Sequence, residues 1–158
     1  MKRSLLAPLL LALALLSGCG MFSTEKDETA GWSPQKLYGD PRTLFVADFM
    51  GSNNALKGRV VSASGGQAEI AGKDWRLKGS AMNASPKGEA MIRVERTLIA
   101  TAARENAIEM TLDSALYLGE RWELRFARDG LEVRVWSTKR PEPGRYWVEF
   151  PPADLWVF

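Results

Sequence analysis

The sequence has 158 residues, enough for one compact domain and little more. It contains 21 Lys and Arg against 19 Asp and Glu, and Lys2 and Arg3 account for the whole excess. Because the rest of the chain is neutral, no nucleic acid is expected as a partner. The chain has no histidine, which excludes histidine-based triads and most zinc and iron sites. Its single cysteine, Cys19, excludes an intrachain disulfide. We therefore expect no metal and no cofactor.

Residues 1–18 have the pattern of a secretory signal peptide. A basic start precedes an apolar run from Leu5 to Leu16, which is shorter than the ~20 residues of a membrane-spanning helix. The ending Leu16-Ser17-Gly18-Cys19 resembles the lipobox of bacterial lipoproteins. That resemblance implies acylation of Cys19, with palmitate-like chains that anchor the protein to a membrane. The alternative is a buried helix that contains a cysteine by chance.

The residue after Cys19 bears on the destination of such a lipoprotein. It is Gly20, whereas aspartate at this position would favour retention in the inner membrane. By family analogy we expect anchoring in the outer membrane, facing the periplasm. If the leader does not function, the domain would instead lie at the cytoplasmic face of the inner membrane.

Residues 19–38 form a lipidated tether in this interpretation, and their first part is polar. The stretch from Asp27 to Tyr38 resembles the mature start of the lipoprotein of the outer-membrane β-barrel assembly machine. The resemblance covers residues 1–38 only, because no helix pair repeating at about 34 residues follows Tyr38. The assembly function therefore does not carry over.

Residues 39–158 are predicted to form a mainly β domain, a small OB-like barrel or sandwich. Asp40-Pro41 predicts the start of a short helix that ends before Gly51. Glycine turns are predicted at Ser64-Gly65-Gly66 and Asp129-Gly130. The strand-like runs are 56–61, 67–70, 89–94, 122–126, 131–135 and 145–150, and an apolar tail, 155–158, follows them. In the tail, Trp156 and Phe158 are expected to face a partner or to favour dimerisation.

The pattern of residues from position 37 onward resembles the TOBE region, a transport-associated OB domain, of ABC-transporter ATP-binding subunits of the spermidine/putrescine, iron(III) and phosphonate-like family. The matching elements are Leu37-Tyr38, Pro41, Phe45-Val46-Ala47, Phe49-Met50-Gly51, Asn54, Lys57-Gly58-Arg59-Val60, Arg93-Val94-Glu95 and Tyr117-Leu118-Gly119. Val94 departs from the family's proline. The resemblance implies an OB-like fold, structural roles for these residues, and an ATPase subunit or a second copy as partner.

The ATPase machinery of that family has no counterpart in the 158 residues. They contain no Gly-x-x-x-x-Gly-Lys-Ser/Thr phosphate loop and no apolar run that ends in adjacent carboxylates. Ser64-Gly65-Gly66-Gln67 matches the core of the ABC signature motif, but it joins two strand-like runs and is interpreted as a hairpin turn. We therefore expect a non-enzymatic chain that neither binds nor hydrolyses ATP.

The remaining polar and aromatic residues give weaker signals. Trp122 alternates with apolar residues and is assigned to the core, whereas Trp136 and Trp147 fall on the polar phase and are assigned to a contact surface for a protein partner rather than a ligand. Acid–base pairs can be drawn between Glu95 and Glu109 or Asp113 and Glu120, but nothing in their spacing supports them. Three hypotheses follow: a non-catalytic transporter accessory domain, a periplasmic lipoprotein that acts as a binding module, and a non-functional gene-fusion fragment.

Overall fold

A computed structural model describes residues 33–83 and 85–158 of the chain. The described residues from Ser33 to Phe158 form one compact unit. Cys19, the predicted signal peptide and most of the predicted tether lie outside the described residues.

Two short helices open the unit. Helix α2 (Pro34–Gly39) begins with Ser33, whose hydroxyl accepts a hydrogen bond from the Lys36 N–H, and α3 (Leu44–Phe49) begins with Thr43, whose hydroxyl accepts from Val46 N–H. The predicted helix start at Asp40-Pro41 is wrong, because Thr43 supplies the cap. Pro41 is buried in the link between the helices.

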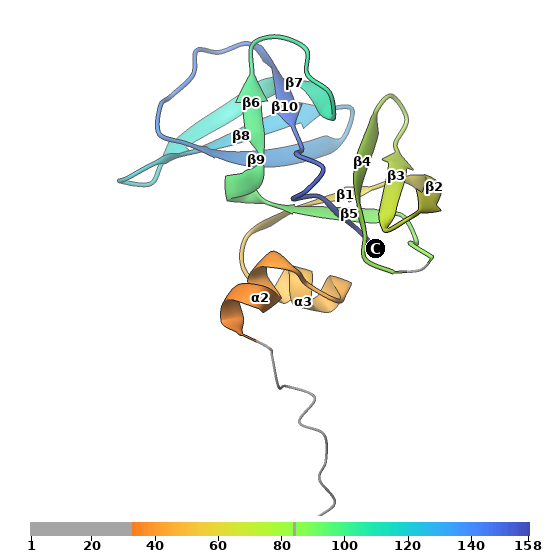
Figure 1. The fold of residues 1–158 in the computed structure, drawn as a ribbon. Coiled ribbons are helices and arrows are strands. Elements are labelled where there is room, and N and C mark those ends of the chain that lie inside the picture. Colours follow the sequence, from red (N-terminus) through yellow and green to blue (C-terminus); the bar gives the residue numbers. More distant parts are fainter. Residues whose placement is uncertain (1–32, 84) are drawn as a thin grey trace, which may run out of the picture. The chain divides into compact units, whose positions relative to one another are not determined.

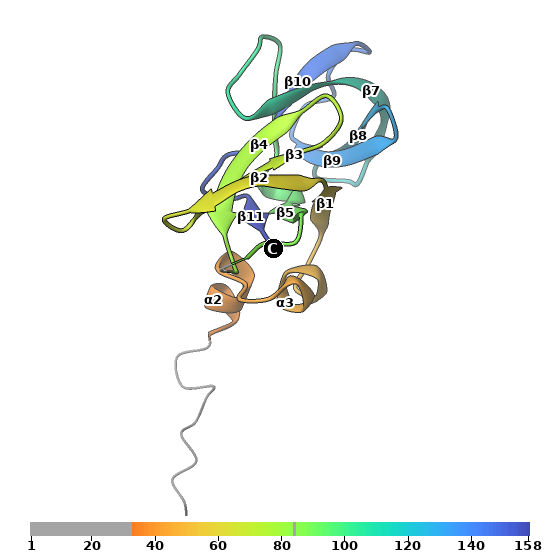
Figure 2. The ribbon, with the colours of Figure 1, turned by 90° about the vertical axis from the view of Figure 1, so that its right-hand side faces the viewer.

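The strands form two sheets, and the predicted fold class, a small OB-like barrel or sandwich, is confirmed. Figures 1 and 2 show a curled five-stranded sheet beside a six-stranded one, with both helices next to β1 and β5. Across the six-stranded sheet the order is β1 (Asn53–Lys57), β5 (Glu89–Arg93), β11 (Trp156–Val157), β4 (Arg76–Ala81), β3 (Gln67–Ala71) and β2 (Arg59–Ser64). Across the five-stranded sheet the order is β6 (Leu98–Ala100), β10 (Arg145–Glu149), β7 (Ala107–Tyr117), β8 (Trp122–Arg128) and β9 (Leu131–Ser137). A single 3-10 turn, η1 (Val94–Arg96), connects β5 to β6.

Both predicted glycine turns are confirmed as two-residue hairpins. Ser64 pairs with Gln67 across Gly65 and Gly66, whose φ angles are 60° and 79°. Arg128 likewise pairs with Leu131 across Asp129 and Gly130. Two consecutive positive φ angles match the right-handed twist of the flanking strands, and glycine adopts them without steric cost.

The predicted strand 56–61 is wrong, because Gly58 divides it into β1 and β2. The Gly58 N–H donates to the Gly88 carbonyl at 2.9 Å. A Cβ at position 58 would lie 2.6 Å from the Ala71 carbonyl oxygen. Only glycine permits this close approach, so the chain changes direction here.

The apolar tail does not face a partner, which corrects the expectation for Trp156 and Phe158. Strand β11 lies in the middle of the six-stranded sheet, parallel to β4 and antiparallel to β5. Leu155 and Val157 are fully buried in the main core, and Trp156 and Phe158 are almost fully buried on the other side. A strand of only two residues forms here because its neighbours satisfy its backbone hydrogen-bonding groups on both sides.

Apolar side chains on facing sides of the two sheets form the main core. Its fully buried members include Leu56, Leu77, Ile92, Leu124, Phe126 and Val148. The strict alternation predicted for 122–126 and 131–135 is confirmed, with Leu124, Phe126, Val133 and Val135 inward. Trp122 is half-buried against this core.

A second, smaller cluster lies on the opposite face of the six-stranded sheet. There Ala47 and Leu44 of α3 pack on Met91, Trp156 and Phe158. The helices are thus fixed to the sheet by a layer of their own. None of the helices in the described part is long and apolar enough to cross a membrane.

Candidate functional site

Arg93 is the centre of the connection between the helices and the sheet. The side chain ends β5 and is 1% exposed. Its guanidinium donates to the Tyr38 carbonyl at 2.9 Å, to the Ala47 carbonyl at 2.8 Å and to Asn53 Oδ1 at 2.7 Å. These acceptors come from α2, α3 and β1, so one side chain joins three elements. We call Tyr38, Ala47, Asn53, Arg93 and Glu95 the Arg93 cluster.

Aromatic rings complete the environment of the guanidinium. Its central carbon lies 4.1 Å from the centroid of the Tyr38 ring and 5.1 Å from that of Trp156. Burial lowers the pKa of Arg93 below its usual value, while Tyr38 and Glu95 act in the opposite direction. An arginine still carries its charge at neutral pH, so the cluster holds a buried cation on carbonyl oxygens and ring faces.

Tyr38 also connects the cluster to Glu95. Its hydroxyl donates to Glu95 Oε1, whereas Glu95 Oε2 is buried without a partner in the described part of the chain. Burial raises the pKa of the Tyr38 hydroxyl, and the hydrogen bond and negative charge of Glu95 raise it further. Gly51 lies against this ring, since a Cβ there would be 3.0 Å from Tyr38 Cε2.

Replacing Tyr38 with phenylalanine should change how stability depends on pH. A raised pKa stabilises the folded state below the ordinary tyrosine pKa of about 10, and that contribution is lost as pH rises beyond it. Urea unfolding between pH 8 and 11 should therefore show a shallower alkaline decline in Tyr38→Phe than in the wild type. At neutral pH the variant should lose about 1 kcal/mol from the missing hydrogen bond. The exposed Tyr117→Phe is the control and should keep the wild-type decline; equal declines in all three proteins would refute the role of Tyr38.

Val94 stands where the resembling family pattern has proline, and the structure gives a reason for the difference. Val94 is fully buried, and its N–H donates to the Ser52 carbonyl at 3.2 Å. Proline, which stands here in the resembling family pattern, could not donate this bond. The junction after β5 is therefore fixed by a backbone hydrogen bond in this chain.

Asn54 joins the two sheets across the gap between β1 and β9. It is 4% exposed, and its amide donates to the Arg134 carbonyl at 2.7 Å and to Thr97 Oγ1 at 3.0 Å, while its own oxygen accepts from Arg134 N–H at 2.8 Å. The side chain thus pairs with β9 as a peptide group of a neighbouring strand would. Asn106 acts similarly on β4, where it bonds both backbone groups of Lys78.

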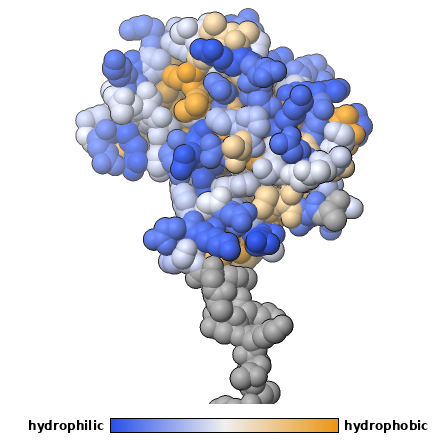
Figure 3. Space-filling model, in the orientation of Figure 1, coloured by the Kyte–Doolittle hydropathy of each residue, from blue (hydrophilic) through white to orange (hydrophobic). Residues whose placement is uncertain are grey.

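Helix α3 has a second apolar face that no other described element covers. Phe45 is 73% exposed and Phe49 is 75% exposed, and their rings stack with centroids 5.8 Å apart. On the face shown in Figure 3, hydrophilic residues dominate and apolar ones gather in small separate patches. A stacked pair of exposed phenylalanines on the helix held by Arg93 is therefore a candidate contact surface. We call Phe45 and Phe49 the α3 face.

The Tyr117-Leu118-Gly119 element lies away from the Arg93 cluster, and the carboxylates considered as acid–base pairs do not meet one another. Tyr117, Leu118 and Gly119 form the turn between β7 and β8, where all three are exposed and the Tyr117 hydroxyl donates to the Gly119 carbonyl. The carboxylates considered as acid–base pairs have separate partners: Glu95 accepts from Tyr38, Glu109 pairs with Arg145, and Glu120 pairs with Arg121.

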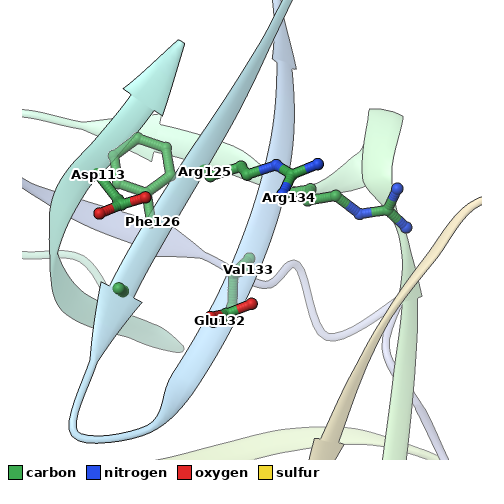
Figure 4. Close-up of a pocket in the computed structure, with 7 residues that line it drawn as sticks. Asp113, Arg125, Phe126, Glu132, Val133 and Arg134 are labelled. Carbon is green, nitrogen blue, oxygen red and sulfur yellow. The ribbon is translucent and has the colours of Figure 1, made fainter. Parts of the chain in front are cut away.

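A depression of about 350 Å³ lies over β8 and β9, but its charged groups do not converge. Figure 4 shows the Arg125 and Arg134 side chains extending to the same side, apart from the carboxylates of Asp113 and Glu132. Arg134 is engaged with the Asn53 carbonyl at 3.1 Å and with Glu123 at 3.8 Å. The depression therefore has no arrangement suited to acid–base chemistry.

The sequence placed Tyr38 at the end of a tether, indicated no role for Thr97 or Asn106, and assigned Trp156 to a partner contact rather than to the environment of Arg93. The signal for Tyr38 was its place in the Leu37-Tyr38 element, which precedes Pro41 at a fixed spacing. Thr97 and Asn106 carried no signal, because a polar residue between strands resembles any surface residue until its partners are known.

The chain is similar to a transport protein. It is 29% identical, over 126 residues, to the spermidine/putrescine import ATP-binding protein PotA of Acetivibrio thermocellus. The aligned part is 79% of this chain and 35% of that protein, so the chain spans about a third of the length of this relative. No protein-family model matches the chain.

Proposed function

We propose that the β unit acts as a TOBE-type accessory domain that binds an ATP-binding subunit of an ABC transporter and does not itself hydrolyse ATP. The observation that carries this proposal is the similarity over 79% of the chain to an import ATP-binding protein, combined with the OB-like fold. Part of the resembling pattern has a structural use: Gly51, Arg93 and Glu95 all contact Tyr38. The role is one of binding and positioning.

The two-residue hairpin at Gly65-Gly66 supports a non-catalytic role. In an ATPase, the signature sequence begins a helix, and catalysis depends on a phosphate loop and carboxylate-held magnesium. In this chain Ser64 and Gln67 are paired strand residues. The hairpin therefore presents no helix N-terminus to a nucleotide.

The α3 face is the proposed docking surface for the ATP-binding subunit. It is apolar and exposed, and it lies on the element that Arg93 fixes to the sheet. About two thirds of the relative's length has no counterpart in the alignment. An ATP-binding subunit that contains that part would supply an apolar surface for Phe45 and Phe49. Burial of two phenylalanine side chains would contribute about 3–6 kcal/mol before the costs of association.

The test is co-purification of the chain with ABC ATP-binding subunits co-expressed from the same genome. Phe45→Ser and Phe49→Ser should each weaken the complex by at least about tenfold, because central aromatic residues dominate interface energies. Leu116→Ser is the matched control, since Leu116 is also exposed but lies on β7. A complex that is insensitive to both phenylalanine changes, or equally sensitive to Leu116→Ser, would contradict the proposed surface. Size-exclusion chromatography of the chain alone identifies self-association as the competing outcome.

The leader favours a second candidate function, a membrane-anchored lipoprotein that uses the β unit as a binding module. The ending Leu16-Ser17-Gly18-Cys19 is the observation behind it. In this version the protein faces the periplasm from the outer membrane, away from cytoplasmic ATP-binding subunits. An accessory role instead requires the unit on the cytoplasmic side.

Cys19→Ala separates these locations. If Cys19 is acylated, the wild-type chain should fractionate with membranes with an N-terminus at residue 19, and the variant should be released or left uncleaved. Two or more acyl chains give stable anchoring, whereas one is marginal, so the loss should be nearly complete. The measurement is the intact mass of the mature protein together with membrane fractionation. Unchanged mass and membrane retention in the variant would exclude lipidation at Cys19.

A further inference from the structure

The turn between β7 and β8 carries three consecutive exposed apolar side chains. Leu116 is 57% exposed, Tyr117 is 56% exposed and Leu118 is 46% exposed. The turn itself is closed by a hydrogen bond from the Leu118 N–H to the Arg121 carbonyl at 2.8 Å. We call Leu116, Tyr117, Leu118 and Trp122, which pairs with Tyr117 across the turn, the β7–β8 tip.

Apolar side chains lie on both faces of the tip. Tyr117 pairs with Trp122, and their ring centroids lie 5.0 Å apart. These two rings share a face with the buried Leu124, because side chains alternate along a strand. Leu116 precedes Tyr117 by one residue and therefore points to the opposite face, while Leu118 lies at the turn. A protein that packs on one face of the hairpin would leave the other face exposed, whereas an apolar medium around the tip covers both.

Several polar groups at the tip have partners within the chain. The Leu118 N–H donates to the Arg121 carbonyl, and the Tyr117 hydroxyl donates to the Gly119 carbonyl. Glu120, the acidic residue of the turn, forms an ion pair with Arg121 at 2.9 Å. In a medium without water, each backbone group that lacks a partner is costly, so a segment that enters lipid needs pairing of this kind.

Positive charge lies beside the tip, in the loop that follows β9. The guanidinium carbon of Arg140 is 5.5 Å from the centroid of the Trp122 ring. Lys139 and Arg140 are exposed, and no ion pair engages either of them among the described residues. Glu142, in the same loop, also has no ion pair in the described part, so the loop keeps an excess of positive charge. Such an excess is attracted to anionic lipid headgroups.

Tyrosine, tryptophan and leucine accompanied by lysine and arginine are the side chains that proteins place at the boundary between lipid and water. We propose that the β7–β8 tip inserts into the surface of a membrane that contains anionic lipids. Leu118 enters the acyl region, the Tyr117 and Trp122 rings lie at the level of the headgroups, and Lys139 and Arg140 bind lipid phosphates. This contact goes beyond both proposed functions, each of which brings the β unit to a membrane, and it leaves the α3 face free for a protein partner.

The test places a fluorophore that responds to polarity at the tip of the full chain. Leu118→Cys is labelled with nitrobenzoxadiazole in a Cys19→Ala background, so the chain has one thiol and acylation at position 19 plays no part. Asp129→Cys, labelled in the same background, is the control, because the β8–β9 turn lies at the other end of β8 (Figure 1). The probes are vesicles of phosphatidylcholine alone and vesicles with equal amounts of phosphatidylcholine and phosphatidylglycerol.

Vesicles that contain phosphatidylglycerol should shift the emission at position 118 to shorter wavelength, and nitroxide-labelled lipid should quench it. Emission at position 129 should stay unchanged, because binding through the leader alone would not select one turn. No shift at position 118, or an equal shift and quenching at position 129, would overturn the proposal. A shift at position 118 with an added ATP-binding subunit but none with vesicles would also overturn it, and would assign the tip to a protein contact.

The contribution of charge is measured by titrating the signal at position 118 with lipid. Replacing both Lys139 and Arg140 with glutamine should raise the lipid concentration at half-saturation by at least about fivefold. The same replacement of Lys57 and Arg59, which are exposed and have no ion pair among the described residues, is the matched control and should leave that concentration unchanged. Equal effects of the two double replacements, or equal binding to both kinds of vesicle, would contradict recognition of anionic lipids.

Discussion

Arg93→Ala should lower the free energy of unfolding by about 3–5 kcal/mol, the largest effect expected of a single substitution in this chain. The change leaves the carbonyls of Tyr38 and Ala47 and the Asn53 side chain without their donor. It also opens a cavity beneath the rings of Tyr38 and Trp156. Because the acceptors lie on three elements, the loss should release α2 and α3 from the sheet.

Urea unfolding followed by circular dichroism measures this effect, and Arg93→Lys provides the comparison. Lysine keeps the positive charge but offers one compact ammonium group in place of the planar guanidinium, which donates in several directions at once. We expect it to recover less than half of the loss. A variant Arg93→Ala within 1 kcal/mol of the wild type would show that the helices are held mainly by the apolar cluster around Trp156.

Asn54→Leu should lower the free energy of unfolding by about 3 kcal/mol, because it separates the two sheets at the β1–β9 gap. Leucine is similar in size to asparagine but leaves Thr97 Oγ1 and both backbone groups of Arg134 without this partner. Each buried polar group left unsatisfied costs about 1–3 kcal/mol, and water that enters the gap would recover part of it. The measurement is the urea midpoint with an unchanged m-value.

Asn83→Leu is the control for that change. Asn83 is exposed in the segment between β4 and β5, so the same substitution there should shift stability by less than about 0.5 kcal/mol. Equal effects at positions 54 and 83 would mean that the Asn54 hydrogen bonds do not hold the sheets together.

Local patterns predicted the parts of the fold that depend on neighbouring residues. Alternation identified the strands around Leu124 and Val133, and paired turn residues identified the hairpins at Gly65-Gly66 and Asp129-Gly130. These features need only the strand period and the φ preferences of glycine and aspartate. They were sufficient to predict a mainly β domain.

The features that the sequence did not predict depend on distant partners. Strand β11 pairs Trp156 with Ser80 and Met91, residues far away along the chain, and a two-residue strand has no period of its own. The apolar tail therefore resembled an exposed contact surface. Long-range hydrogen bonds such as that from Asn54 to Arg134 leave no periodic trace either.

The candidate site was predicted in part for the same reason. Arg93, Glu95 and Gly51 belonged to the family-like pattern, yet the pattern gave no indication that all three meet at Tyr38. Tyr38 itself was assigned to the tether, because a short helix capped by Ser33 has too few residues for a clear apolar period. The assignment of Trp136 to a contact surface stays a prediction, and the stacking of Arg121 on its ring could be found only from the coordinates.

The proposed accessory role is tested most directly by photo-crosslinking in cells. A benzophenone amino acid replaces Phe45 on the exposed face of α3, and the adducts are identified by mass spectrometry. The same amino acid at Leu116 is the control for random encounters. The proposal predicts a position-45 adduct with an ATP-binding subunit of an ABC transporter. Adducts only with other copies of the chain or with periplasmic proteins, or the same adducts from position 116, would contradict it.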